Sequence, residues 1–191
     1  MLIVFEGIDG SGKETQIQLL RENLVKKGKR CVVIKYPTKH YQMLNDYLEK
    51  EVSIDSKALF LLFLADIAED QSTIKKALST NDVVILDRYV FSTISYEVNL
   101  IDYPSGKKIV ENISYLKPDH VILLDIDSKI SQARKSKQKA LDRYEENAIY
   151  LDKVRLNFLK LFEERFLTPN WHKIDASKAI EAVQADILRV F

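Results

Sequence analysis

The sequence predicts a single α/β domain in which a five-stranded parallel sheet is covered by helices on both faces. Two observations support this prediction. Short runs of consecutive apolar residues alternate with longer segments whose apolar residues recur at helical spacing. The apolar runs show no alternation with polar residues, which is typical of strands buried on both faces, as in parallel sheets. We find no linker or internal repeat in the 191 residues, so one domain spanning residues 1–191 is expected.

The expected strands are the apolar runs at residues 2–6, 31–35, 83–86, 121–124 and 171–174. Helical periodicity predicts helices at residues 13–27, 41–51, 56–78, 107–116 and 179–191, a helix through Ser92 and Tyr96, and an interrupted helical segment at 129–166. Gly28 is expected to cap the C-terminus of the first helix. Pro104, Ser105 and Gly106 are expected to form a break ahead of the helix at 107–116.

Composition and charge exclude several classes of protein. The net charge is +1, so nothing points to a nucleic-acid or membrane-surface partner. No apolar segment approaches the ~20 residues that span a bilayer, and the N-terminal residues do not have the pattern of a signal peptide. Cys31 is the one cysteine and has no partner for an internal disulfide, which fits an intracellular, cytoplasmic protein. The three histidines show no metal-ligand spacing.

The segment between the first strand and the first helix has the spacing of a phosphate-binding loop, Gly7-x4-Gly12-Lys13. Glycines allow successive backbone N–H groups to point at one centre, and the helix N-terminus adds positive potential. Lys13 supplies a cation for the outer phosphates. We therefore expect ATP phosphates to bind Gly7, Ile8, Asp9, Gly10, Ser11, Gly12, Lys13, Glu14 and Thr15.

Glu14 departs from the usual pattern of this loop. A Ser or Thr hydroxyl normally follows the lysine and binds Mg²⁺. Two interpretations of Glu14 are open. Its carboxylate either reaches Mg²⁺ itself or is simply an acidic residue in the first turn of a helix, where it suits the helix dipole.

Asp87-Arg88-Tyr89 directly follows the third predicted strand. Since ligands of parallel sheets bind at the carboxyl ends of the strands, this tripeptide is expected near the phosphate-binding loop. Asp87 can hold Mg²⁺ or its waters, and Arg88 can bind a second phosphate in bidentate fashion. The alternative is an ion pair that only joins strand to helix, but the nearby phosphate loop favours a functional role. Other polar residues at predicted strand ends are Glu6, Lys35 and Asp125.

Residues 129–143 contain six basic side chains and one acidic one. Such a run is commonly a solvated helix face. The functional interpretation is a lid, at about 129–146, that closes cations over a triphosphate. Because the loop has Gly10 where an arginine could lie, any arginine for the transferred phosphoryl group has to come from elsewhere. The lid arginines Arg134 and Arg143 are the expected source.

Together these features resemble the thymidylate kinase family of nucleoside monophosphate kinases, over nearly the whole chain. The resemblance is carried by residues 5–13, 36–37, 87–97 and 141–145, with support from 61–66 and 171–176. It implies a three-layer P-loop NTPase fold with a helical lid. It also implies the reaction of ATP with dTMP to give ADP and dTDP, with Mg²⁺, in a homodimer formed through helices that include the one from Ser56.

The resemblance also implies roles for individual residues. Lys13 and the loop amides would hold the ATP phosphates, Asp87 would organise Mg²⁺ and its waters, and the lid arginines would assist transfer as in the bacterial type. The residues implied to bind dTMP are Asp9 at the sugar 3′-hydroxyl, Phe63 stacked on thymine, Arg88 at the phosphate, Ser92 near the base, Tyr96 against the 2′ position, and Tyr36 and Lys39 in the loop after the second strand.

Two further departures from the family pattern bear on the substrate. Lys39 replaces an arginine in reach of the acceptor phosphate, and Ile67 replaces an arginine that helps recognise the base. They leave two alternatives open: a related kinase with altered base specificity, and a catalytically impaired paralogue that binds nucleotide. A guanine-nucleotide switch is disfavoured because the chain has no Asn-Lys-x-Asp base-reading motif.

Overall fold

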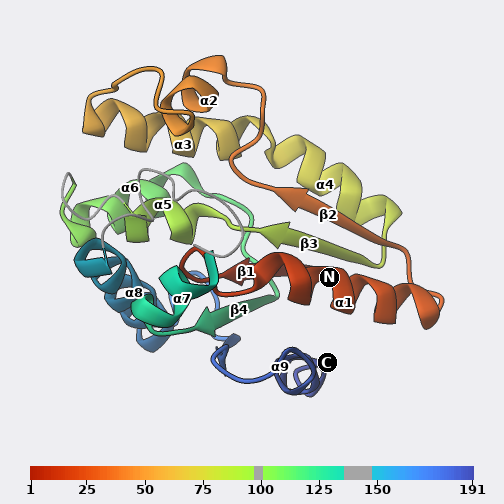
Figure 1. Ribbon diagram of the computed structural model, residues 1–191. Helices are drawn as coiled ribbons and strands as arrows, with labels where there is room; N and C mark the ends of the chain where they lie inside the picture. Colours follow the sequence, from red (N-terminus) through yellow and green to blue (C-terminus); the bar gives the residue numbers. More distant parts are fainter. Residues whose placement is uncertain (97–100, 136–147) are drawn as a thin grey trace.

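The computed structural model describes residues 1–96, 101–135 and 148–191 and has a five-stranded, all-parallel sheet at its centre (Figure 1). The strands are β1 (Leu2–Glu6), β2 (Cys31–Lys35), β3 (Val83–Asp87), β4 (His120–Asp125) and β5 (Trp171–Asp175). Their order across the sheet is β2-β3-β1-β4-β5. All five predicted strands are confirmed, and β1 and β3 are buried along their whole length, as the continuous apolar runs indicate.

Helices cover both faces of this sheet, as predicted. In the described residues they are α1 (Lys13–Lys26), α2 (Gln42–Leu48), α3 (Ser56–Glu69), α4 (Gln71–Thr80), α5 (Val90–Tyr96), α6 (Tyr103–Ile113), α7 (Ser128–Lys135), α8 (Ala148–Glu163) and α9 (Ile180–Leu188). Helices α1 and α9 pack against each other on one face, and α4, α5 and α8 lie on the other (Figure 1). None of these helices is long and apolar enough to cross a lipid bilayer.

The strand register places the polar residues at the strand ends next to one another. Phe5 of β1 pairs with Asp87 of β3, and Asp87 also pairs with Lys35 of β2. The loop that leaves β1 therefore starts beside the segment that leaves β3, at the carboxyl edge of the sheet. The core beneath this edge is formed by fully buried side chains of β1, β3 and β4 with those of the flanking helices.

Two predictions of helix boundaries differ most from the structure. The segment predicted as one helix from 56 to 78 is two helices that meet at Asp70, a buried residue whose carboxylate accepts a hydrogen bond of 2.7 Å from the Tyr36 hydroxyl. The break predicted at Pro104 is wrong, because Pro104 lies in the first turn of α6. A proline fits there since no intrahelical bond needs its N–H, and Asp102 caps this turn by accepting from the Ser105 amide at 3.0 Å.

Candidate active site

The loop between β1 and α1 is built around glycines that no other residue can replace easily. Gly7, Gly10 and Gly12 all have positive φ, of 139°, 77° and 91°. A Cβ on Gly7 would lie 2.5 Å from the Leu124 carbonyl oxygen, and one on Gly10 would lie 2.7 Å from the Ser131 carbonyl oxygen. The loop is thus enclosed by β4 and α7, and its backbone is curled as the motif predicts.

Lys13 is buried at the base of this loop and is held by the loop itself. Its ammonium donates to the carbonyl oxygens of Gly7 at 2.9 Å and Ile8 at 3.1 Å. Burial lowers the pKa of Lys13 to about 8, and the nearby Arg88 guanidinium adds to the effect. An incoming polyphosphate would therefore find a preorganised cation whose charge it stabilises further.

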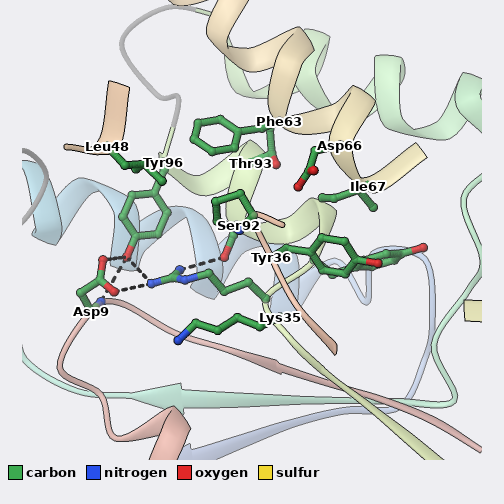
Figure 2. A pocket seen from close by; sticks show the side chains of 13 residues that line it. Asp9, Lys35, Tyr36, Leu48, Phe63, Asp66, Ile67, Ser92, Thr93 and Tyr96 are labelled. Atoms are coloured by element: carbon green, nitrogen blue, oxygen red, sulfur yellow. Dashed lines mark hydrogen bonds and ion pairs between the residues drawn. The ribbon is translucent and has the colours of Figure 1, made fainter. Parts of the chain in front are cut away.

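Asp9, Arg88 and Tyr96 form one hydrogen-bonded network beside the loop (Figure 2). Arg88 Nη2 donates to Asp9 Oδ1 at 2.5 Å, and the Tyr96 hydroxyl donates to Asp9 Oδ2 at 2.9 Å. Arg88 Nη1 donates to the Ser92 hydroxyl at 3.0 Å. The network fixes the guanidinium in place, so Arg88 is preorganised to receive a phosphate.

Glu6 positions this network through hydrogen bonds to Tyr89 and Ser92, and this role was not predicted from the sequence. Its fully buried carboxylate accepts hydrogen bonds from the Tyr89 amide at 2.8 Å, the Ser92 amide at 3.2 Å and the Ser92 hydroxyl at 2.6 Å. Glu6 thereby satisfies the amide of Tyr89, just before α5, and that of Ser92 in the first turn of α5, next to Arg88, whose φ of 71° is left-handed. Burial raises the pKa of Glu6 to about 7, although the Ser92 hydrogen bond and the charge of Arg88 oppose the shift.

Asp87 has the environment expected of a magnesium ligand. Its carboxylate is 7% exposed, and Oδ2 lies 3.5 Å from Lys35 Nζ. Its Oδ1 oxygen is buried and has no hydrogen-bond partner among the residues that the structure describes. A hard cation prefers such an oxygen. Glu14 is exposed and faces the same cavity, and the described residues contain no cluster of three or more potential metal-binding side chains.

Two adjoining cavities meet at this network. The first, which we call the donor cavity, is lined by the loop residues Asp9 to Gln16 together with Lys35, Asp87, Arg88, Arg134, Ala176, Lys178, Ala179, Ile180 and Val183. The second, the acceptor cavity, is lined by Asp9, Lys35, Tyr36, Pro37, Leu48, Phe63, Asp66, Ile67, Arg88, Tyr89, Ser92, Thr93 and Tyr96. Asp9, Lys35 and Arg88 line both cavities, so two ligands with phosphate groups would meet there.

The acceptor cavity is polar at one end and largely apolar at the other. Asp9 and Tyr96 lie at one end, while Tyr36 and Ile67 lie at the other, with Phe63 between them (Figure 2). Ile67 is 3% exposed and brings no hydrogen-bond donor to this wall. The Asp66 carboxylate there is already engaged, because it accepts from the Thr38 amide at 2.7 Å and from the Thr38 hydroxyl.

Most of the predicted site residues come together in these two cavities, but five require separate description. Gly7 and Ile8 line neither cavity, and their carbonyl oxygens accept from Lys13. Lys39 is exposed and lines neither cavity. Arg134 lines the donor cavity, where its guanidinium donates to the carbonyl oxygens of Ala176 at 2.9 Å and Ser177 at 3.3 Å. Arg143, with residues 136–147 of the predicted lid, lies outside the described residues.

One wall of the donor cavity was missed by sequence reasoning; it is formed by Ala176, Lys178, Ala179, Ile180 and Val183. Their signal is weak, because they follow the edge strand β5 and carry no motif of their own. Asp125, at the end of β4, was expected at the same edge as Asp87, but it lines neither cavity. It forms a bidentate ion pair with Arg155 of α8, at 2.6 and 3.1 Å, and so joins the sheet to that helix.

Comparison with known proteins decides the family. The family model described as thymidylate kinase matches residues 5–187, and therefore spans both cavities. The chain belongs to the thymidylate kinase family. It is 38% identical to the thymidylate kinase of Thermosipho africanus, over 98% of this chain and 95% of that protein. It is 32% identical to the human thymidylate kinase, over 97% of this chain and 87% of the human protein.

A thymidylate kinase of Schizosaccharomyces pombe is likewise 32% identical, over 98% of this chain and 89% of that protein. Membership of the thymidylate kinase family thus rests on relatives from bacteria and eukaryotes that align over nearly their whole length. The family assignment confirms the resemblance predicted from the motifs, together with the α/β fold of the P-loop NTPase type.

Proposed function

We propose that this protein transfers the γ-phosphoryl group of ATP to dTMP and so produces ADP and dTDP. The observation that carries the proposal is the pair of cavities that share Asp9, Lys35 and Arg88. One cavity has the phosphate-binding loop that suits ATP. The other has a fixed arginine, an aromatic side chain and a small polar end, which suit a nucleoside monophosphate.

ATP would bind with its β- and γ-phosphates against the loop amides and Lys13. Asp87 would hold Mg²⁺ through its buried Oδ1 oxygen, and the exposed Glu14 carboxylate faces the same cavity. When bound, the ion offsets negative charge on the phosphates. Asp87 is itself kept in place by its position at the end of β3, where it pairs in register with β2.

The acceptor phosphate would bind to Arg88, whose guanidinium is already oriented by Asp9 and Ser92. In the transfer step, a phosphate oxygen of dTMP forms a bond to the γ-phosphorus. The bond from this phosphorus to the β,γ-bridging oxygen breaks, and that oxygen leaves with the electron pair on ADP. The attacking oxygen is already anionic, so no general base is required, and the protein acts through positioning and charge.

The rest of the acceptor cavity would select the nucleoside. Phe63 offers a face on which thymine can stack. The Asp9 carboxylate, which accepts from Arg88 and Tyr96, would also accept from the sugar 3′-hydroxyl. The Tyr96 ring closes the sugar end of the cavity and would exclude a 2′-hydroxyl, which favours deoxyribose.

A coupled assay of ADP release tests the proposal. With MgATP and dTMP, ADP and dTDP should form in equal amounts, and the product is identified as dTDP by chromatography. Thymidine, which lacks the phosphate, should not support ADP release at the rate seen with dTMP. Binding of both nucleotides without ADP formation would contradict the proposal and would instead identify an impaired paralogue.

Ile67 favours a second candidate function, a related kinase with broader base specificity. An arginine at this position would offer charged donors to the base, whereas the buried Ile67 offers none. The loss of such donors is worth about 1.5–3 kcal/mol of base discrimination. Comparable kinetics with dTMP, dUMP, dCMP and dGMP would support this candidate. A preference for dTMP above about a thousandfold would exclude it.

We also propose that the protein is a homodimer that includes α3 in its interface. The exposed Leu61 on α3, at 53% exposure, supports this assignment. Light scattering should then give twice the 22.1 kDa mass of the chain. Leu61→Lys should give the mass of one chain, and a wild-type mass of 22.1 kDa would contradict the proposal.

A further inference from the structure

Lys35 occupies a position between the two cavities that sequence reasoning did not connect with substrate. It is the last residue of β2 and pairs in register with Asp87. Its side chain lines both the donor and the acceptor cavity. Figure 2 shows this side chain extending toward the end of the acceptor cavity at which Asp9 lies. The lysine therefore lies where the two phosphate groups would meet.

The charges shared by the two cavities differ in how far they are already engaged. The Arg88 side chain is 15% exposed and is held by Asp9 and Ser92. The Lys35 side chain is 64% exposed, and its one ionic partner among the described residues is Asp87, at 3.5 Å. That separation is beyond the usual length of a charged hydrogen bond, so the three N–H donors of Lys35 remain accessible to a ligand.

Lys39 was expected to supply a cation for the acceptor phosphate, yet it lies on the exposed part of the loop and lines neither cavity. Lys35 comes from the start of the same loop and does line both. The structure thus offers a cation for the acceptor phosphate four residues earlier in the chain than the family pattern suggests. A lysine suits this position because its ammonium is a compact charge on a flexible stem.

We propose that the Lys35 ammonium binds the acceptor phosphate at the junction of the two cavities and there lowers its repulsion from the γ-phosphate of ATP. This inference rests on the proposed function. Arg88 and Lys35 would hold the phosphate from two strand ends, β3 and β2. The loss of one charged contact of this kind is expected to weaken phosphate binding about 10- to 100-fold.

Binding of dTMP and of thymidine tests the proposal without turnover. Lys35→Met keeps the length of the side chain and removes its charge. It should weaken dTMP binding about 10- to 100-fold in calorimetry, while thymidine binding should change less than about twofold, because thymidine has no phosphate. Lys35→Arg should recover most of the affinity for dTMP. Lys76→Met, on the exposed surface of α4 away from both cavities, is the matched control.

Four results would overturn the proposal. Equal losses for dTMP and thymidine would show that Lys35 only shapes the cavity. A loss confined to MgATP would show that Lys35 acts through Asp87. A loss with Lys39→Met and none with Lys35→Met would assign the contact to Lys39. If the wild-type protein binds dTMP no better than thymidine, the proposed function fails as well, and this is visible before any variant is measured.

Discussion

Glu6→Gln is the most informative single substitution for testing the buried residues that position the active site. The glutamate is fully buried and accepts three hydrogen bonds from Tyr89 and Ser92. Glutamine has nearly the same shape but does not titrate, and its amide nitrogen is a donor where the carboxylate is an acceptor. The substitution therefore removes one ionisation from the core with little change in volume.

The expected magnitude follows from the shift in pKa. Burial raises the pKa of Glu6 from 4.5 to about 7, against the opposing effect of Ser92, Arg88 and Lys13. Between these two pH values the folded protein holds a proton that the unfolded chain has released. The free energy of unfolding contributed by Glu6 therefore falls as the pH rises. At about 1.4 kcal/mol per pH unit, the total fall is about 3 kcal/mol.

Urea denaturation followed by circular dichroism, at several values between pH 4.5 and 8.5, measures this effect. The wild-type unfolding free energy minus that of Glu6→Gln should fall by about 3 kcal/mol up to pH 7 and then level off. Glu22→Gln, the same substitution at an exposed position of α1, is the matched control. A wild-type minus Glu6→Gln difference that stays constant, or that grows with pH, would refute the reasoning.

Substitutions at four further positions test the site. Lys13→Ala should lower kcat by about a hundredfold or more while the urea midpoint changes little, and near-wild-type kcat would contradict the role of Lys13. Glu14→Ser should shift the Mg²⁺ dependence of the rate, whereas an unchanged titration would support a role limited to the helix dipole. Tyr96→Ala should reduce the preference of kcat/KM for deoxyribose over ribose about tenfold, whereas Tyr96→Phe, which keeps the ring, should leave it nearly unchanged; an unchanged preference in Tyr96→Ala would contradict the role of the ring. Ile67→Arg should raise discrimination between dTMP and dCMP at least tenfold, and no change would remove this position from base recognition.

The strands could be predicted from the sequence because each is buried on both faces and is therefore a continuous apolar run. The order of the strands could not, because parallel partners carry no pairing signal that is visible in single runs. The ends of the helices were harder to predict because they depend on individual side chains. The apolar stripe from 56 to 78 continues past Asp70, so the periodicity gave no sign that two helices meet there, where the Asp70 carboxylate accepts from Tyr36.

The residues of the site likewise include some that could be predicted from the sequence and some that could not. The loop from Gly7 to Lys13 was predictable because its chemistry is local, and Asp87 and Arg88 were predictable because parallel strands end at one edge. The three hydrogen bonds that Glu6 accepts come from residues more than 80 positions away, so no local pattern reports them. The position of Lys35 likewise depends on the pairing of β2 with β3.

Gly10 determines where positive charge for the transferred phosphoryl group can come from. From the sequence, a glycine there leaves the loop without an arginine for the transferred phosphoryl group. In the structure, a Cβ on Gly10 would lie 2.7 Å from the Ser131 carbonyl oxygen, so the approach of α7 excludes any side chain at this position. Positive charge for the transition state therefore has to come from other segments. We propose that Lys35 supplies part of it from β2, and the sequence predicts Arg143, which lies outside the described residues, as a second source.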